Sequence, residues 1–350
     1  MEILNQRQLN ILEFVKKGGG VSNSEIRENI ENKFDKISRI TIVRDINKLL
    51  EKGLIKKQGQ GRGVRYVEAI KNKLLAYFDV ENYFKLGPDE RKIAFNSFNF
   101  DIFKNILNIF TKEELEKLKI LNDDYLKRIK KLPPTILKKE FERLTIELSW
   151  KSSRIEGNTY SLIDTEILIK EQKEAAGHQK EESIMILNHK AALDYILAQK
   201  NDFKKLNLLK IENIHSLIVK DLGINRGIRK KIVGIVGTRY KPPDNQYQIE
   251  DAMGKTIKVI NTLKNPFTKV LIAILMLSYI QPFEDGNKRT ARLLGNAILL
   301  ADNICPLSFR SIDEGDYKKA MILFYEQNGL RFFKELFIQQ FEFAVKNYFL

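Results

Sequence analysis

Apolar residues recur every three or four positions through the first fifty residues, a spacing that predicts short amphipathic helices. The first helix is expected over residues 4–15, because three consecutive glycines at 18–20 end its pattern. The second is expected to begin at Ser22, since Ser22 and Glu25 have the spacing of a capping box. A third is expected to begin at Ser38. Its predicted buried stripe consists of Ile40, Val43, Ile46, Leu49 and Leu50.

A short β-hairpin is predicted directly after the third helix. An apolar strand begins at Leu54, and the chain returns over residues 64–67 after a glycine-rich tip at 59–63. Three helices followed by such a hairpin predict a winged helix-turn-helix domain over residues 1–69. Within it, residues 41–55 resemble the recognition helices of bacterial and archaeal winged-helix regulators.

The charge of this domain favours double-stranded DNA as its partner. Residues 36–65 contain nine basic and two acidic residues. Side chains near the start of a recognition helix reach base edges in the major groove, and wing cations meet phosphates. A winged helix used only for protein contacts or dimerisation is the alternative. The predicted DNA-binding residues are Arg39, Thr41, Arg44 and Lys48 on the helix and Lys56, Lys57, Arg62 and Arg65 on the wing.

The remaining chain divides into a linker and a larger domain. Residues 70–132 have a helical pattern rich in aromatic residues, which we interpret as core and linker packing. Pro133 and Pro134 mark a break, so the second domain is expected over residues 133–350. It opens with a long helix predicted over about residues 136–157.

A polar loop at residues 281–292 lies between two apolar runs, 270–280 and 293–300, and predicts a helix–loop–helix. A helix beginning near Asn287 directs free N–H groups and its positive dipole end into this loop. Asp285 provides a hard oxygen ligand for Mg²⁺ that is also held by nucleotide phosphates. An ordinary solvated turn is the alternative. The predicted phosphate-binding residues are Gly286, Asn287, Lys288, Arg289 and Arg292.

This loop resembles the motif of the Fic (Fido) family, His-x-Phe-x-Asp/Glu-Gly-Asn-Gly/Lys-Arg-x-x-Arg. The residues that match in order and spacing are Phe283, Asp285, Gly286, Asn287, Lys288, Arg289 and Arg292. Gln281 departs from the pattern, because it stands where the family has its catalytic histidine, the general base. A carboxamide has no titratable lone pair near neutral pH. The loss of a positioned base costs roughly 10²–10⁴-fold in rate.

A second stretch resembles the inhibitory motif of the family, Ser/Thr-x-x-x-Glu-Gly/Asn. Ser152 and Glu156 are four residues apart and share a helix face, and Gly157 follows as a candidate C-cap. The resemblance implies that Glu156 forms a salt bridge with Arg292 and occupies the place of the γ-phosphate. Its position ahead of the main fold implies the subclass with an N-terminal inhibitory helix. A surface glutamate at a helix end is the alternative.

Residues 227–243 alternate like a strand and resemble the flap hairpin that holds a target peptide beside the active loop. Tyr317 and Tyr325 are expected either to flank the adenine of a bound nucleotide or to pack in the core. His189 and His215 are interpreted as packing or hydrogen-bonding residues rather than replacement bases. The predicted flap residues are Ile232, Val233, Gly234 and Ile235.

The amino-acid composition indicates the structural class of the protein and the compartment in which we expect it. Hydrophobic residues at 43% and charged residues at 30% are typical of a soluble globular protein. The net charge of +15 favours a polyanionic partner, although a lysine-rich proteome is an alternative cause. Cys305 is the single cysteine, so no disulfide forms within the chain. No signal peptide or membrane span is predicted, and we expect a cytoplasmic protein without a membrane partner or a zinc site.

We therefore expect a mainly α fold, with a winged helix-turn-helix domain and a Fic-type helical bundle carrying a β-hairpin flap. The favoured function is a DNA-binding regulator whose Fic domain binds ATP and Mg²⁺ but has weak or no protein AMP-transferase activity. One alternative is an active adenylyltransferase that Glu156 inhibits. The other is a Doc-like kinase, because Lys288 replaces the commoner glycine. A protein target, or the chain itself, is expected at the flap, and a homodimer is a further partner that this organisation allows.

Overall fold

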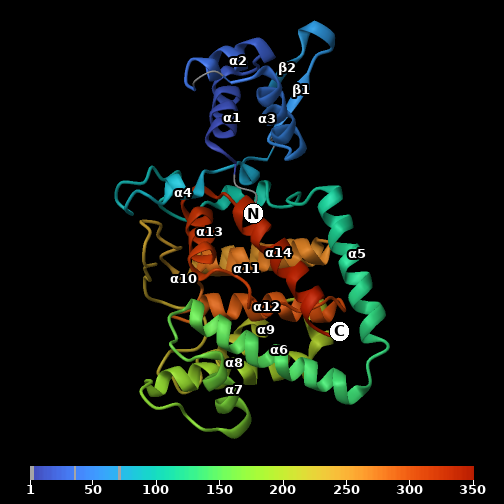
Figure 1. Cartoon of the computed structure of the whole chain (residues 1–350). Coiled ribbons are helices and arrows are strands. Elements are labelled where there is room, and N and C mark those ends of the chain that lie inside the picture. Colours follow the sequence, from blue (N-terminus) through green and yellow to red (C-terminus); the bar gives the residue numbers. More distant parts are fainter. Residues whose placement is uncertain (1–3, 35–36, 70–71) are drawn as a thin grey trace. The chain divides into compact units, whose positions relative to one another are not determined.

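The computed structural model describes residues 4–34, 37–69 and 72–350, and only the backbone of Arg62. The chain is mainly helical and divides after Tyr83 into an N-terminal and a C-terminal compact unit (Figure 1). None of the helices in these described ranges combines the length and the apolar run needed to cross a bilayer.

The N-terminal unit has the predicted order of three helices and a hairpin, and the winged-helix pattern is confirmed. Asn5 and Ser22 cap the first two helices with capping boxes, and Ser38 caps the third. Strands β1 and β2 are antiparallel, with Ile55 opposite Glu68. The elements are α1 (Gln6–Gly18), α2 (Asn23–Glu31), α3 (Arg39–Glu51), β1 (Ile55–Gln58) and β2 (Arg65–Glu68).

The buried face of α3 differs from the prediction. Ile42, Ile46 and Leu49 are buried, whereas Ile40 is 66% exposed. Residues 40 and 42 are about 200° apart on a helix, so only one of them can face the core. Asp45 lies on the buried side because its carboxylate accepts hydrogen bonds from Arg7 and Gln8 of α1. The prediction that Ile40 is buried was therefore wrong.

The expected helical linker over residues 70–132 is wrong for residues 84–111. This segment, which we name the strap, contains a short 3₁₀ turn (Phe100–Lys104), and the first long helix of the unit is α5 (Lys112–Ile129). The strap consists of turns and irregular segments, and some of its backbone groups bond to other elements. The N–H groups of Ala94 and Phe95 both donate to the carbonyl of Glu326.

The C-terminal unit is a helical bundle around α12. That helix is buried along nearly all of its length and packs against α11, α9 and α8 (Figure 1). A helix buried on all sides in this way forms the centre of the core, although the first two turns of α12 carry polar and charged side chains. The bundle helices are α6 (Pro134–Ile155), α7 (Leu162–Glu171), α8 (Lys180–Ala198), α9 (Leu208–Ile218), α10 (Gln246–Thr262), α11 (Pro266–Ile280), α12 (Asn287–Ala301), α13 (Glu314–Gln327) and α14 (Arg331–Asn347).

Candidate functional site

The loop between α11 and α12 is shaped by two left-handed residues. Gln281 ends α11 with φ 49°, and Gly286 precedes α12 with φ 75°. A Cβ on Gly286 would lie 3.1 Å from side-chain atoms of Ile218 and Val219. Gly286 is therefore needed because its backbone has a positive φ and because the end of α9 packs closely against it. The sequence had suggested instead that a glycine here lets the backbone approach a ligand.

Asn287 holds the loop closed. Its Nδ2 donates to the carbonyl of Phe283 at 2.8 Å, and its Oδ1 accepts from the N–H of Phe283 at 2.9 Å. With both amide atoms engaged, Asn287 fixes the loop rather than offering its amide to phosphate. The N-terminal N–H groups of α12 still point toward the loop, as predicted for an anion-binding helix start.

Arg292 joins this loop to the end of α6. Its guanidinium is fully buried and donates to the Ser152 hydroxyl at 2.8 Å, the Ser152 carbonyl at 2.7 Å and the Glu156 carboxylate at 2.8 Å. Gly157 follows with φ 102°, and the N–H of Asn158 bonds back to Ser153, which ends the helix. The two sequence-distant motifs therefore lie side by side.

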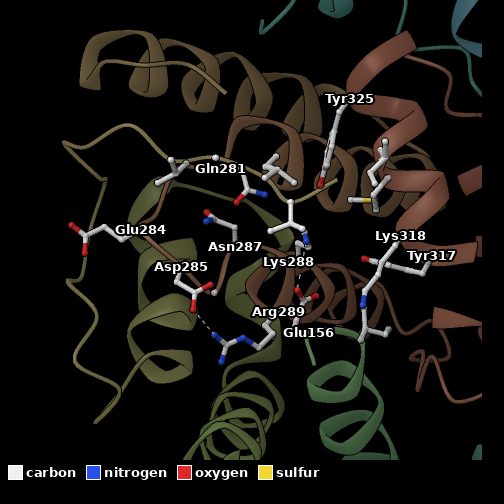
Figure 2. A pocket seen from close by; sticks show the side chains of 18 residues that line it. Glu156, Gln281, Glu284, Asp285, Asn287, Lys288, Arg289, Tyr317, Lys318 and Tyr325 are labelled. Carbon is white, nitrogen blue, oxygen red and sulfur yellow. Dashed lines mark hydrogen bonds and ion pairs between the residues drawn. The ribbon is translucent and has the colours of Figure 1, made fainter. Parts of the chain in front are cut away.

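The Glu156 carboxylate lies among cations (Figure 2). Lys288 Nζ is 3.7 Å from its second oxygen. A carboxylate at a helix C-terminus is disfavoured by the helix dipole, so these cations compensate for its placement. Burial acts to raise the pKa of Glu156, but Arg292 and Lys288 outweigh it, and the net pKa is lowered from its usual 4.5. Glu156 is thus an anion at neutral pH.

Arg289 and Asp285 form a second pair. Arg289 Nη2 lies 3.3 Å from Asp285 Oδ2, and the Arg289 side chain is buried while that of Asp285 is 66% exposed. One terminal nitrogen of Arg289 and one of Arg292 have no hydrogen-bond partner within the described part of the chain. Buried cationic donors left unpaired favour binding of an anion.

A cavity of about 390 Å³ connects these groups with the flap and α13. Lys318, Met321 and Ile322 of α13 line it, and the sequence-based prediction missed these three residues. Their spacing with Tyr317 and Tyr325 places all five on one helix face, a signal that could have identified them. The cavity is also lined by Glu156, Val233, Gly234, Ile235, Gln281, Asp285, Gly286, Asn287, Lys288 and Arg289.

Gln281 lies at the rim between α11 and the flap. Its side chain is largely buried, with the residue 8% exposed, and its Nε2 donates to the Ser278 carbonyl at 2.7 Å. The main-chain carbonyl of Gln281 accepts a hydrogen bond from Arg229 Nε at 2.6 Å. The carboxamide is therefore fixed beside the cavity in a position where it can hydrogen-bond but cannot take up a proton near neutral pH.

Both core histidines are neutral packing residues. His215 stacks on Phe283 with ring centroids 3.8 Å apart, and its Nε2 donates to the Asp285 carbonyl at 3.0 Å. Burial lowers the pKa of His215 to about 4. Burial, together with Arg292 and Arg289, lowers the pKa of His189 well below its usual range. Neither ring is placed on the cavity lining.

The flap does not form the predicted β-hairpin. Residues 227–243 contain no strand in the structure, and Pro242 and Pro243 have no N–H to contribute to a ladder. Lys241 instead makes an isolated bridge with Ser97 of the strap. Val233, Gly234 and Ile235 line the cavity as a flap would, whereas Ile232 is 72% exposed and lies outside the lining.

The predicted DNA-binding residues occupy one helix and the wing. Arg39 and Arg44 on α3 are exposed, and so are Lys56 and Lys57 on β1. Thr41 is half-buried, with its hydroxyl in the cap of α3, and Lys48 is half-buried as well. Arg65 is exposed and donates to the Gly20 carbonyl. The side chain of Arg62 lies outside the described residues.

Comparison with known proteins places this geometry in context. The Fic/DOC family model matches residues 205–299, and the penicillinase repressor model matches residues 4–84. A protein adenylyltransferase Fic from Aedes aegypti is 31% identical over 179 residues, 49% of this chain and 35% of that relative. One from Nematostella vectensis is 27% identical over 187 residues, 52% of this chain and 43% of that relative. The chain thus spans less than half of the length of these relatives.

Solved structures agree on the fold. A fragment of Fic-1 from C. elegans superposes with a TM-score of 0.59 at 21% identity, covering 67% of this chain and 70% of that one. A Fic family protein from Desulfovibrio desulfuricans superposes with a TM-score of 0.55 at 20% identity, covering 69% and 75%. The chain therefore contains a Fic/DOC domain, preceded by a winged-helix-like domain of the penicillinase repressor type.

Proposed function

We propose that the protein is a DNA-binding regulator whose Fic/DOC domain binds a nucleotide, is held back by Glu156 and has weak or no protein AMP-transferase activity. One observation carries the nucleotide part. The Glu156 carboxylate lines the cavity with the buried Arg292 behind it at 2.8 Å, and Lys288, Arg289 and Lys318 supply the cations of the lining. A bound phosphate would compete with it for the same guanidinium.

ATP and Mg²⁺ fit the residues around this cavity. Buried guanidinium nitrogens without partners and the start of α12 suit phosphate oxygens. Mg²⁺ in nucleotide sites is commonly bound by one or two carboxylates together with phosphate oxygens, and the exposed carboxylate of Asp285 is a ligand of this kind. When bound, the metal would neutralise phosphate charge, and Arg289 would orient the Asp285 carboxylate through their ion pair.

Gln281 is the reason for expecting weak catalysis. It stands where the resemblance places the histidine that deprotonates a target hydroxyl. The carboxamide can position that hydroxyl through its oxygen, but the proton then has no acceptor of suitable pKa on this residue. His215 and His189 do not substitute for it, because both rings are engaged or enclosed behind the loop.

Calorimetry of Mg·ATP binding tests the nucleotide site. Glu156→Gly and Glu156→Gln should bind Mg·ATP at least about tenfold more tightly than wild type, because the competing anion is gone. The matched control is Glu314→Gln, which removes a carboxylate that also pairs with two cations, Lys151 and Arg154, but does not line the cavity. Absence of binding by all variants would overturn the proposal.

Radiolabel transfer distinguishes the alternatives. An active adenylyltransferase transfers the AMP group, which contains the α-phosphate, and releases pyrophosphate, so Glu156→Gly incubated with α-labelled ATP should label itself or a target. A Doc-like kinase transfers the γ-phosphate instead. In our proposal Glu156→Gly is labelled roughly 10²–10⁴-fold more slowly than the double variant Glu156→Gly/Gln281→His. Equal rates would contradict the role assigned to Gln281.

The regulator part rests on the winged-helix-like unit. Exposed Arg39 and Arg44 on α3, with Lys56 and Lys57 on the wing, support contact with duplex DNA. Binding of the full chain to duplex DNA should fall steeply between low and moderate salt. The variant Arg39→Ala/Arg44→Ala should lose sequence preference, whereas Lys56→Ala/Lys57→Ala should weaken binding to all sequences alike. A full chain that binds no duplex at low salt would exclude this part.

A further inference from the structure

Ile40 stands out on α3, because the isoleucines and leucine that follow it at the core face are buried. Ile42, Ile46 and Leu49 have almost no exposed surface, whereas Ile40 is 66% exposed. Within the described residues of the N-terminal unit, Ile40 is the one large apolar side chain that is mainly exposed. A single exposed apolar residue is common on protein surfaces, so its neighbours decide whether it has a use.

These neighbours are polar side chains on the outward face of the same helix. Successive residues of a helix are about 100° apart, so Arg44 and Asn47 lie within about 40° of Ile40, opposite the buried residues. Both are exposed. We name Ile40, Arg44 and Asn47 the outward ridge of α3. At a rise of about 1.5 Å per residue, the ridge spans about 10 Å along the helix axis.

The charge of this face is positive. Asp45, the acidic residue in the first two turns of α3, is buried and pairs with Arg7 of α1. Arg39 and Arg44 remain exposed beside Ile40. A surface that binds another protein presents a contiguous apolar patch, which one isoleucine between arginines does not provide. An apolar side chain among cations instead matches the major groove of DNA, where phosphates border a floor that carries the methyl groups of thymine.

The three side chains of the outward ridge match three different bases. Guanine presents two acceptors to an arginine, adenine presents an acceptor and a donor to an asparagine amide, and thymine presents a methyl group to an apolar side chain. Residues near the start of a recognition helix reach these base edges. Thr41, which the sequence suggested for this role, is half-buried and its hydroxyl is hydrogen-bonded with that of Ser38 at 2.9 Å. Ile40 is therefore better exposed for contact with a base than Thr41.

We propose that Ile40 is a specificity-determining residue, which packs against the C5-methyl group of a thymine in the major groove. The inference rests on the proposed DNA binding and specifies part of the sequence that the winged-helix-like unit selects. Stacked bases of one strand are about 3.4 Å apart, and the outward ridge is about 10 Å long. The thymine should therefore lie within about three base pairs of the bases that Arg44 and Asn47 contact.

Removal of one methyl group from the DNA tests this proposal on the full chain. A duplex selected from a random library should contain this thymine, and uracil in its place should lower the affinity about fourfold. The A·U pair presents the same hydrogen-bonding groups as A·T and lacks only the methyl group. Ile40→Ala, a change at an exposed position, should bind the thymine and uracil duplexes equally. The matched control is Asn47→Ala on the same ridge, which should bind both duplexes more weakly and keep the fourfold difference.

The other outcomes separate this inference from DNA binding itself. A selected duplex in which no replacement of thymine by uracil changes the affinity would overturn the role of Ile40. A uracil effect that Ile40→Ala retains would assign the methyl group to another side chain. Loss of the uracil effect in Asn47→Ala as well would mean that the placement of the whole helix, and not Ile40, determines it. A full chain that binds no duplex at low salt would remove the proposed DNA binding, and this inference with it.

Discussion

The two walls of the cavity, the loop and the flap, differ in how far their polar groups are bonded within the domain. In the loop at 281–292, Asn287 and Arg292 find their partners inside the domain, and Gly286 fits against α9. In the flap at 230–236, no backbone–backbone hydrogen bond is made to any residue that the structure describes, and Val236 is 97% exposed. The first wall is preorganised for a small anion, whereas the second is anchored at Arg229 and Lys241 and exposed between them.

The largest expected effect is the loss of stability when the glycine of the loop wall is replaced, with a glycine of the flap wall as the control. Gly286→Val places a Cβ at a φ of 75° and 3.1 Å from Ile218 and Val219. Strain at positive φ and overpacking together should lower the free energy of unfolding by about 4 kcal/mol. Urea unfolding measures this loss, and the midpoint should shift without a change in slope.

The matched control for that change is Gly234→Val in the flap. A Cβ on Gly234 meets no atom within 4 Å. Its effect should stay within about 0.5 kcal/mol. If both valine variants lose the same stability, the two walls do not differ as described, and the flap is packed more tightly than its exposure indicates.

A smaller expected effect is the pH dependence of folding stability, which arises next to the loop wall and not in the flap. Because burial lowers the pKa of His215 to about 4, the unfolded chain binds a proton between pH 6.5 and pH 4 that the folded chain does not. Stability should therefore fall as pH drops through this window, by about 3 kcal/mol for this residue. His189, whose pKa burial also lowers, adds to the loss.

His215→Gln should flatten this slope, which unfolding midpoints at a series of pH values will show. The flap contributes nothing to it, since its titratable residues at 227–243 are lysine, arginine and tyrosine. An unchanged stability slope in His215→Gln would contradict the buried, neutral histidine.

Local patterns in the sequence were enough to predict most of the helices and the loop. The capping box at Ser22, the apolar runs around the loop and the four-residue spacing of Ser152 and Glu156 each depend on neighbours in sequence. The Fic pattern also indicated which cation would meet Glu156, and Arg292 does so in the structure. Short-range spacing and a known motif predicted these contacts correctly, whereas the strand-like alternation of the flap and its resemblance to the family hairpin did not produce strands.

Long-range partners explain the failures. The aromatic strap had a helical pattern, but two of its backbone donors, the N–H groups of Ala94 and Phe95, bond to Glu326, more than two hundred residues away. Ile40 seemed to belong to a buried stripe, yet the partners of Asp45 on α1 fix the rotation of α3. The α13 lining of the cavity was missed although its helical spacing with Tyr317 and Tyr325 could be read from the sequence, because that spacing alone does not separate a cavity wall from a core face.

The smallest expected effect isolates the open wall. Ile232 is 72% exposed, so Ile232→Ser should leave the unfolding midpoint nearly unchanged, within about 0.5 kcal/mol. A protein target at the flap, which the resemblance implies, would cover this side chain, and its loss should slow labelling of that target by Glu156→Gly/Gln281→His about fivefold. Ile163→Ser on α7 removes an isoleucine that is 70% exposed and should leave both quantities unchanged. Equal labelling rates in the two variants would mean that Ile232 is exposed for no partner, and the open wall would then be an ordinary surface loop.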